Sequence, residues 1–246
     1  MPKAPLASFL ARNPFPNGLT DGLFYREKMR AIHRIAPQSL APAGRVARVL
    51  DIGGGRSGLA AMLYPDAQVV TLDRDFDLHG LGPVDTPFVC ADARALPFAD
   101  GTFDAVTLFD VLEHVVDDRA AAAEALRVTR PGGCILASTP SAAWRYPYFR
   151  FMRAVCPPET SLMAEWGHVR RGYDRRAIEA LFGGPAESTA SFINPLTAFY
   201  HDVSFSRLGR RQRQVLYALA SPVAALGYLG HAAGARGAEA AFAWRR

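Results

Sequence analysis

Short apolar runs alternate with helix-like segments along the first two thirds of the chain. The runs at 45–52, 68–73 and 103–109 carry Val, Leu and Ile and are bounded by Gly, Pro or Asp. Residues 57–63 and 117–129, which lie between such runs, have the spacing and composition of helices. Apolar strands that alternate with helices are typical of a parallel sheet covered on both faces. The pattern therefore predicts a doubly wound α/β fold.

Weaker patterns extend this prediction toward both ends of the chain. Apolar residues at helical spacing predict a helix from Thr20 or Asp21 through Ile35, ended by Pro37, and we expect it to cover one end of the sheet. The remaining predicted elements are a third strand ending at Cys90-Ala91-Asp92, a fifth strand Cys134–Ser138 after the helix stop Pro131-Gly132-Gly133, a helix Asp174–Phe182, a sixth strand Glu187–Ile193 and a seventh strand Ala238–Trp244. We expect a Rossmann-like, mostly parallel sheet of seven strands, the last antiparallel, with helices on both faces.

The chain is long enough for one such domain. Its 246 residues, 21% charged and 50% hydrophobic, are ordinary for a globular protein. We interpret residues 1–246 as a single domain with an N-terminal helical cover over 1–44 and a helical insertion over 194–237 before the last strand. No secretory signal is visible, so we expect a cytoplasmic protein. The three cysteines lack metal-ligand spacing, and we predict neither a disulfide framework nor a metal site.

The insertion contains an uncharged stretch whose role has three interpretations. Residues 215–235 carry no acidic or basic residue except His231, and a membrane span needs about 20 apolar residues. Pro222 and the many Ala and Gly residues argue against a span and favour core packing. The arginines just upstream keep an interfacial membrane helix open, with a peripheral contact through 207–235.

The net charge of +5 includes arginine clusters near 170–176 and 207–213. They form either a solvated surface or a surface for an anionic partner. No nucleic-acid-binding module accompanies them, so we expect no nucleic-acid partner. The oligomeric state stays open.

The most informative motif is a glycine turn after the first strand. Gly53, Gly55 and Gly58 follow the strand that ends with Asp51 and Ile52. Glycine admits positive φ angles and a close approach of a ligand to the main chain, and the next helix N-terminus favours polar or anionic groups. The spacing also fits the dinucleotide-binding fingerprint, so the turn alone does not decide between nucleoside ligands.

Further acids follow the next two strands. Asp73 ends the second strand, where a carboxylate can accept hydrogen bonds from ribose hydroxyls, and Asp92 ends the third. Two later motifs are Phe109-Asp110-Val111-Leu112-Glu113-His114 and Arg130-Pro131-Gly132-Gly133. This ordered series resembles the class I S-adenosylmethionine-dependent methyltransferases, particularly the ubiquinone/menaquinone-type group, over about residues 45–182.

The resemblance implies S-adenosylmethionine as cofactor and a role for each matching residue. Asp51 would lie near the methionine amino group, Gly53 and Gly55 would admit the cofactor, Asp73 would bind ribose, Asp92 and the Ala93 backbone would bind adenine, and Phe109 and Asp110 would line the methionine end. Ser57 and Arg74 depart from the family pattern. Ser57 can cap the following helix, whereas Arg74 can stack on adenine or bind a 2′-phosphate, as in some NADP-binding proteins.

Methyl transfer depends mainly on positioning, and an imidazole suits the general base that a hydroxyl acceptor needs. The candidate bases are His114 and His168. Aromatic residues after the fifth strand are placed to form the substrate wall, and we select Trp144, Tyr146, Tyr148, Trp166 and Tyr173.

We therefore predict a methyltransferase (EC 2.1.1.-) that acts on O, N or C of a small or medium, partly apolar acceptor. A catalytically silent cofactor-binding protein is the alternative, with the aromatic wall and insertion serving a partner or membrane. An NADP-dependent oxidoreductase shares the glycine turn but leaves Asp92 and the later motifs unexplained.

Overall fold

A computed structural model describes residues 1–14, 22–40, 44–55, 57–78, 80, 84–231 and 236–246. Their central element is a seven-stranded sheet in the order β3-β2-β1-β4-β5-β7-β6. The strands are β1 Arg48–Ile52, β2 Gln68–Asp73, β3 Phe88–Cys90, β4 Phe103–Phe109, β5 Thr129–Pro140, β6 Ser188–Phe192 and β7 Glu239–Arg245. Neighbours from β3 to β5 pair in parallel, and β7 runs antiparallel to both β5 and β6. The predicted Rossmann-like sheet, with its antiparallel last strand, is confirmed.

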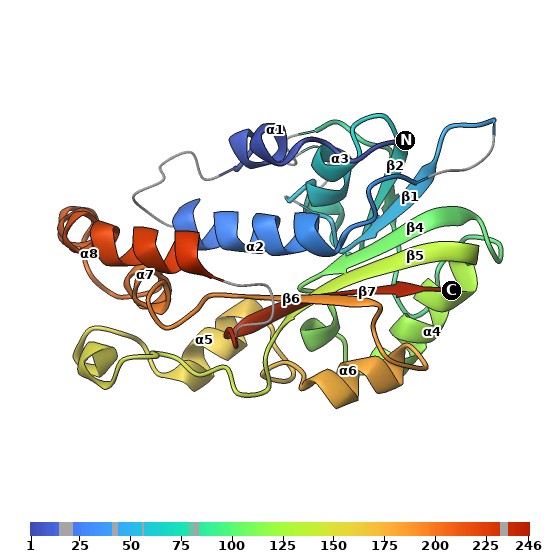
Figure 1. Cartoon of the computed structure of the whole chain (residues 1–246). Helices are drawn as coiled ribbons and strands as arrows, with labels where there is room; N and C mark the ends of the chain where they lie inside the picture. Colours follow the sequence, from blue (N-terminus) through green and yellow to red (C-terminus); the bar gives the residue numbers. More distant parts are fainter. Residues whose placement is uncertain (15–21, 41–43, 56, 79, 81–83, 232–235) are drawn as a thin grey trace.

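Helices cover both faces of this sheet (Figure 1). They are α1 Leu6–Ala11, α2 Gly22–Ile35, α3 Leu59–Leu63, α4 Asp118–Val128, α5 Glu159–Trp166, α6 Arg175–Leu181, α7 Ala198–Ser204 and α8 Arg210–Gly230. Three short 3-10 turns, η1 Phe76–Leu78, η2 Leu112–His114 and η3 Arg150–Ala154, follow β2, β4 and β5. Helices α1, α2 and α3 lie on one face, and α4 and α6 lie on the other (Figure 1).

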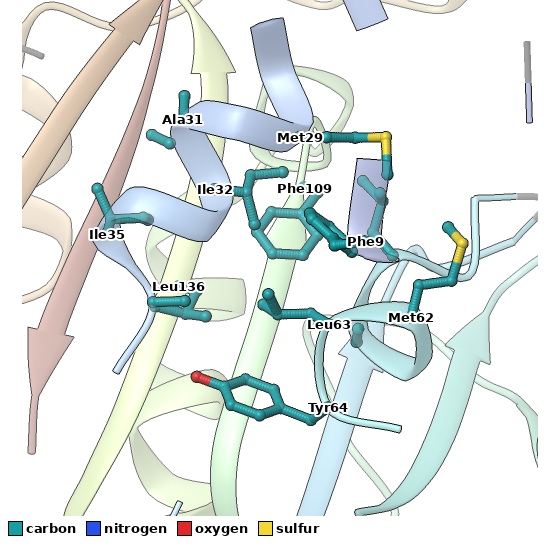
Figure 2. Packing of buried hydrophobic residues seen from close by; sticks show 14 of the residues in the cluster. Phe9, Met29, Ala31, Ile32, Ile35, Met62, Leu63, Tyr64, Phe109 and Leu136 are labelled. Atoms are coloured by element: carbon teal, nitrogen blue, oxygen red, sulfur yellow. The ribbon is translucent and has the colours of Figure 1, made fainter. Parts of the chain in front are cut away.

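Two cores form because side chains alternate across each strand. On the α2 face, Ile32 and Phe9 pack with Phe109 of β4 and Leu136 of β5 (Figure 2). On the other face, neighbouring strand residues such as Leu108 pack against α4 and α6. Strands buried on both sides explain the nearly continuous apolar runs in the sequence.

Helix α2 covers the β6 end of the sheet, as predicted, by packing on the face of β6, β7 and β5. Its predicted cap residues 20 and 21 lie outside the described residues. The structure corrects one predicted element, the helix stop after α4. Residues 131–133 do not stop α4, which ends at Val128, because the chain enters β5 at Thr129. The register slips between Phe103 and Ala105, so residues 130–133 form a bulge within the strand.

The predicted helical insertion is present between β6 and β7. Helix α8 packs closely on the segment before α7, where a Cβ on Gly227 would lie 2.6 Å from Leu196 Cβ. Tyr200 of α7 donates a hydrogen bond to the Tyr217 carbonyl oxygen of α8 at 2.8 Å. Arg30 of α2 donates to the Tyr228 carbonyl oxygen at 2.7 Å, which ties α8 to α2. No helix in the described part of the chain is long and apolar enough to cross a membrane.

Candidate functional site

A cavity of about 450 Å³ lies at the carboxyl ends of the parallel strands. Its lining includes six residues that the sequence predicts for the cofactor site or for catalysis: Gly53, Asp73, Asp92, Ala93, Asp110 and His114. These residues follow four different strands, β1 to β4, and meet because parallel strands end at the same edge of a sheet. Gly55 lines a smaller neighbouring cavity, whereas Phe109 is buried in the α2-side core.

The glycine turn leaves room that a side chain would fill. Gly53 has φ +67°, and a Cβ there would lie 2.4 Å from a methyl group of Val111, so both conformation and space require glycine. Ser57 does not cap the next helix, because Gly58 is the N-cap residue and has no side-chain cap. The Ser57 hydroxyl instead donates to the Gly54 carbonyl oxygen at 2.9 Å and closes the turn.

Asp51 supports the turn from behind and does not line the cavity. Its carboxylate is buried and accepts a hydrogen bond from Thr107 Oγ1 of β4 at 2.6 Å. Burial raises the pKa of Asp51 to about 6, and the hydrogen bond from Thr107 opposes that shift. A Cβ on Gly54 would lie 2.5 Å from Asp51 Oδ2, so this second glycine is needed for the acid to sit under the turn.

The acids at the ends of β2 and β3 differ in their surroundings. Asp73 Oδ1 accepts from the Asp75 backbone N–H at 3.1 Å, and Arg74 beside it lines the cavity. Asp92 forms an ion pair with Arg94 at 2.6 Å. The hydrogen bonds from Arg94 lower the pKa of Asp92 to about 2. Asp92 is therefore a fixed acceptor at the cavity rim.

Asp110 is held at the other end of the cavity by two partners from distant elements. The Lys28 ammonium of α2 and the Ser138 hydroxyl of β5 both donate to its carboxylate, the latter at 2.6 Å. Asp110 has φ +54°, a conformation that a non-glycine residue adopts only when its surroundings impose it. No motif in the sequence marks Lys28, which lies on a helix predicted only as a cover.

The two candidate bases lie side by side. The His114 and His168 rings are 4.5 Å apart between centroids and nearly perpendicular. Burial lowers the pKa of both imidazoles, that of His168 to about 4. His114 lines the cavity, whereas His168 is not among the lining residues and has a buried Nδ1 without a hydrogen-bond partner in the described structure.

Four of the five predicted wall residues form one aromatic cluster, together with His201 of α7. The cluster contains Trp144, Tyr146, Tyr148, Trp166 and Phe205, each with its ring 4.9–6.4 Å from the His201 imidazole. Trp144 is only 2% exposed. Tyr173 lies elsewhere, where its hydroxyl bridges Asp118 and the Leu112 carbonyl oxygen. None of these residues lines the 450 Å³ cavity.

Comparisons with known proteins agree with this geometry. The profile of a family described as "Methyltransferase domain" matches residues 50–137. The demethylmenaquinone methyltransferase of Renibacterium salmoninarum is 41% identical over 113 residues, which cover 44% of this chain and 46% of that protein. That of Paenarthrobacter aurescens is 38% identical over 120 residues, covering 45% and 47%. The chain thus spans about half the length of the curated relatives that it matches.

Solved structures show the same fold over nearly the whole chain. The N-methyltransferase NodS from Bradyrhizobium japonicum, in complex with S-adenosyl-L-homocysteine, has a TM-score of 0.54 and 16% identity, and covers 98% of this chain and 96% of that one. Residues 50–137 thus match a methyltransferase-domain family, and the chain has the fold of this solved methyltransferase. The predicted resemblance to the quinone-type group is also confirmed.

Proposed function

We propose that this protein transfers a methyl group from S-adenosylmethionine to a small or medium, partly apolar acceptor. The observation that carries the proposal is the single cavity that collects Gly53, Asp73, Asp92, Asp110 and His114 from the ends of four strands. Demethylmenaquinone, named for the two relatives above, is an acceptor of this type. An NADP-dependent enzyme needs no His114 or Asp110 at this end of the cavity.

Each lining residue has a part in this proposal. Asp73 accepts hydrogen bonds from the ribose hydroxyls, Asp92 and the Ala93 backbone hold adenine, and Asp110 lies at the methionine end. Gly53 provides the close approach to the main chain that its missing Cβ allows. When bound, S-adenosylmethionine supplies an electrophilic methyl group, so the chief task of the protein is to hold the acceptor in line with it.

Among the two imidazoles, we propose His114 as the general base for a hydroxyl acceptor. It lines the cavity, and its lowered pKa keeps the ring neutral and able to take a proton near neutral pH. His168 packs against it and holds its orientation. The aromatic cluster follows β5 beyond the same sheet edge, and we propose that its half-buried members, Tyr148 and Trp166, face the acceptor's apolar part.

Unbiased identification of the acceptor tests the activity. Cell extract incubated with the protein and methyl-labelled S-adenosylmethionine should yield one labelled small molecule by mass spectrometry. Calorimetry with S-adenosylhomocysteine and with NADP should give binding of the first alone. Binding without any labelled product would favour the silent alternative, and tight NADP binding without S-adenosylhomocysteine binding would remove the methyltransferase proposal.

We further propose that 207–235 brings the protein to a membrane surface from the cytoplasmic side. From Val215 onward, the exposed residues of α8, which form its outward face, carry no polar side chain: Val215, Ala218, Leu219, Pro222, Val223, Ala225, Leu226, Leu229 and Gly230. Three exposed arginines, Arg207, Arg210 and Arg211, flank this face at its N-terminal end. An apolar helix face beside basic residues is typical of helices that lie in the membrane interface, and anionic lipid is the partner that complements both.

A further inference from the structure

Two segments far apart in the sequence are fixed against each other beside the cavity. Turn η2, which carries Glu113 and His114, is tied to the segment after α5, which carries His168. The Val169 backbone N–H donates to the Glu113 carbonyl oxygen at 2.9 Å. The Arg170 guanidinium donates to the carbonyl oxygens of Leu112 and Val115 at 2.7 and 2.8 Å. These hydrogen bonds hold η2 and the segment after α5 together, so the side chains of Glu113, His114 and His168 lie close to one another.

Gly167 turns the chain between the two segments. It ends α5 with φ +72°, in the left-handed region that favours glycine, and it lies in van der Waals range of His114. The left-handed turn at Gly167 directs the next residue, His168, onto His114. The turn at Trp166-Gly167-His168 thus places the His168 imidazole against the His114 imidazole.

Three potential ligand atoms converge at this point. A carboxylate oxygen of Glu113 and one ring nitrogen from each of His114 and His168 lie within 4.8 Å of one another. Glu113 is fully buried, yet its Oε1 has no hydrogen-bond partner in the described part of the chain, and neither has the buried His168 Nδ1. Buried polar atoms are normally paired, so two unpaired atoms in one cluster point to an absent partner.

The local charge favours a cation as that partner. Two further acids, Asp110 and Glu239, lie near enough to Glu113 to act on it electrostatically. Among the described residues, the cations that act on the cluster are Lys28 and, toward His114, Arg74. Lys28 already pairs with Asp110. Neutral imidazoles and a carboxylate are the ligands that zinc and other first-row divalent ions take, whereas Mg²⁺ and Ca²⁺ prefer oxygen alone.

We propose that Glu113, His114 and His168 form a binding site for one divalent transition-metal ion at the acceptor side of the cavity. Atoms bound to one such ion lie within about 4 Å of each other, so side-chain shifts below about 1 Å close the site. Three protein ligands leave positions open for a further oxygen. Because His114 lines the cavity, an acceptor hydroxyl can fill one of them.

The catalytic consequence rests on the proposed methyl transfer. A hydroxyl bound to the ion becomes more acidic, and its proton passes to solvent water while the oxygen stays on the metal. A His114 nitrogen that binds the ion cannot also take a proton. When the ion is bound, that nitrogen therefore does not act as the general base. Metal binding itself is independent of this consequence and can be measured without turnover.

The test is Co²⁺ and Zn²⁺ binding to the full chain after treatment with a chelator. Calorimetry should show one ion per chain at micromolar concentration, and Co²⁺ should give a visible absorption band. His168→Ala and Glu113→Gln should each weaken binding about tenfold or more. The matched control is His33→Gln, since His33 bonds the Ala4 carbonyl oxygen far from the cluster. Cys90→Ser, as common background, removes the exposed thiol.

The outcomes separate this proposal from the proposed function. No binding by the parent protein, binding only at millimolar concentration, or unchanged binding by both ligand variants overturns the metal site. S-adenosylhomocysteine calorimetry on the same samples reports the cofactor site and the folding of each variant. Cofactor binding without ion binding overturns the metal site and leaves the methyltransferase proposal standing. Ion binding without cofactor binding supports the metal site and counts against the methyltransferase proposal.

Discussion

Lys28 of α2 donates its ammonium to the Asp110 carboxylate, which directly follows β4. The two side chains lie in a partly buried setting, 12% and 29% exposed. Nearby acids, Asp110 first, raise the pKa of Lys28 despite its burial. Helix α2 therefore supports the cavity from outside its lining, because Lys28 neutralises the acid that we propose for the methionine end.

Replacement of Lys28 tests that tie. Removing one member of a buried ion pair leaves an uncompensated charge, which costs about 3–5 kcal/mol. Lys28→Met should lower the free energy of unfolding by up to that amount in urea titrations. Lys28→Met combined with Asp110→Asn should recover most of the loss, since no charge is then left unpaired. Equal losses in the single and double variants would show that the pair does not hold the two elements together.

Asp73 should act on cofactor binding alone. The loss of a hydrogen bond to a charged group costs about 1.5–3 kcal/mol, so Asp73→Ala should weaken S-adenosylhomocysteine binding about tenfold to a hundredfold. Calorimetry measures this effect, with Asp66→Ala as a control because Asp66 is exposed in the turn before β2. An unchanged affinity would take Asp73 out of the ribose site.

Tyr148 distinguishes an acceptor wall from simple packing. Its buried hydroxyl has no hydrogen-bond partner within the described ranges. Tyr148→Phe should therefore keep or slightly raise stability while it reduces methyl transfer and spares S-adenosylhomocysteine binding. Tyr200→Phe is the matched control, because the Tyr200 hydroxyl donates a hydrogen bond to the Tyr217 carbonyl oxygen. That variant should lose about 1 kcal/mol of stability and keep its full rate of methyl transfer. Full transfer by Tyr148→Phe would contradict a role of this hydroxyl in acceptor binding.

His201 should make stability sensitive to acid. Burial lowers its pKa to about 3, whereas the unfolded chain takes up the proton near pH 6.5. The folded state is thus favoured above the unfolded pKa, and this stability is lost as pH falls toward the folded pKa. Between pH 7 and 5 the protein should lose about 2 kcal/mol more than His201→Phe. Urea titrations at both pH values measure the difference, and parallel losses would exclude His201 as the cause.

Much of the fold could be predicted because strands buried on both faces leave continuous apolar runs. The bounds of β2 and β4 agree with the prediction residue for residue. The error at 129–133 has a local cause: Pro and two glycines resemble a helix stop, yet they also form a bulge inside a strand. Packing against α4 and β4, which sequence does not show, decides between the two.

The site was predictable where chain order and strand ends decide position, as for Asp73 and Asp92. It was not predictable where separate elements meet in space. Lys28 looks like an ordinary surface position of an amphipathic helix, and only the fold brings it to Asp110. His201 likewise lies in an insertion that carries no motif. In the fold its ring contacts Phe24 and the five aromatic rings of the cluster, an arrangement that the sequence does not show.

The outward face of α8 gives the last prediction. Leu219 and Leu226 are 73% and 68% exposed, although both are large and apolar. Each flanking arginine near an anionic bilayer contributes about 1 kcal/mol, and salt screens this attraction. The protein should float with phosphatidylserine-containing vesicles at low salt and be released at high salt, whereas Leu219→Glu should stay unbound. Val46→Glu, which alters an exposed apolar residue just before β1, should bind like the parent. A parent protein that stays unbound at low salt would make this helix face a lid or a protein contact instead.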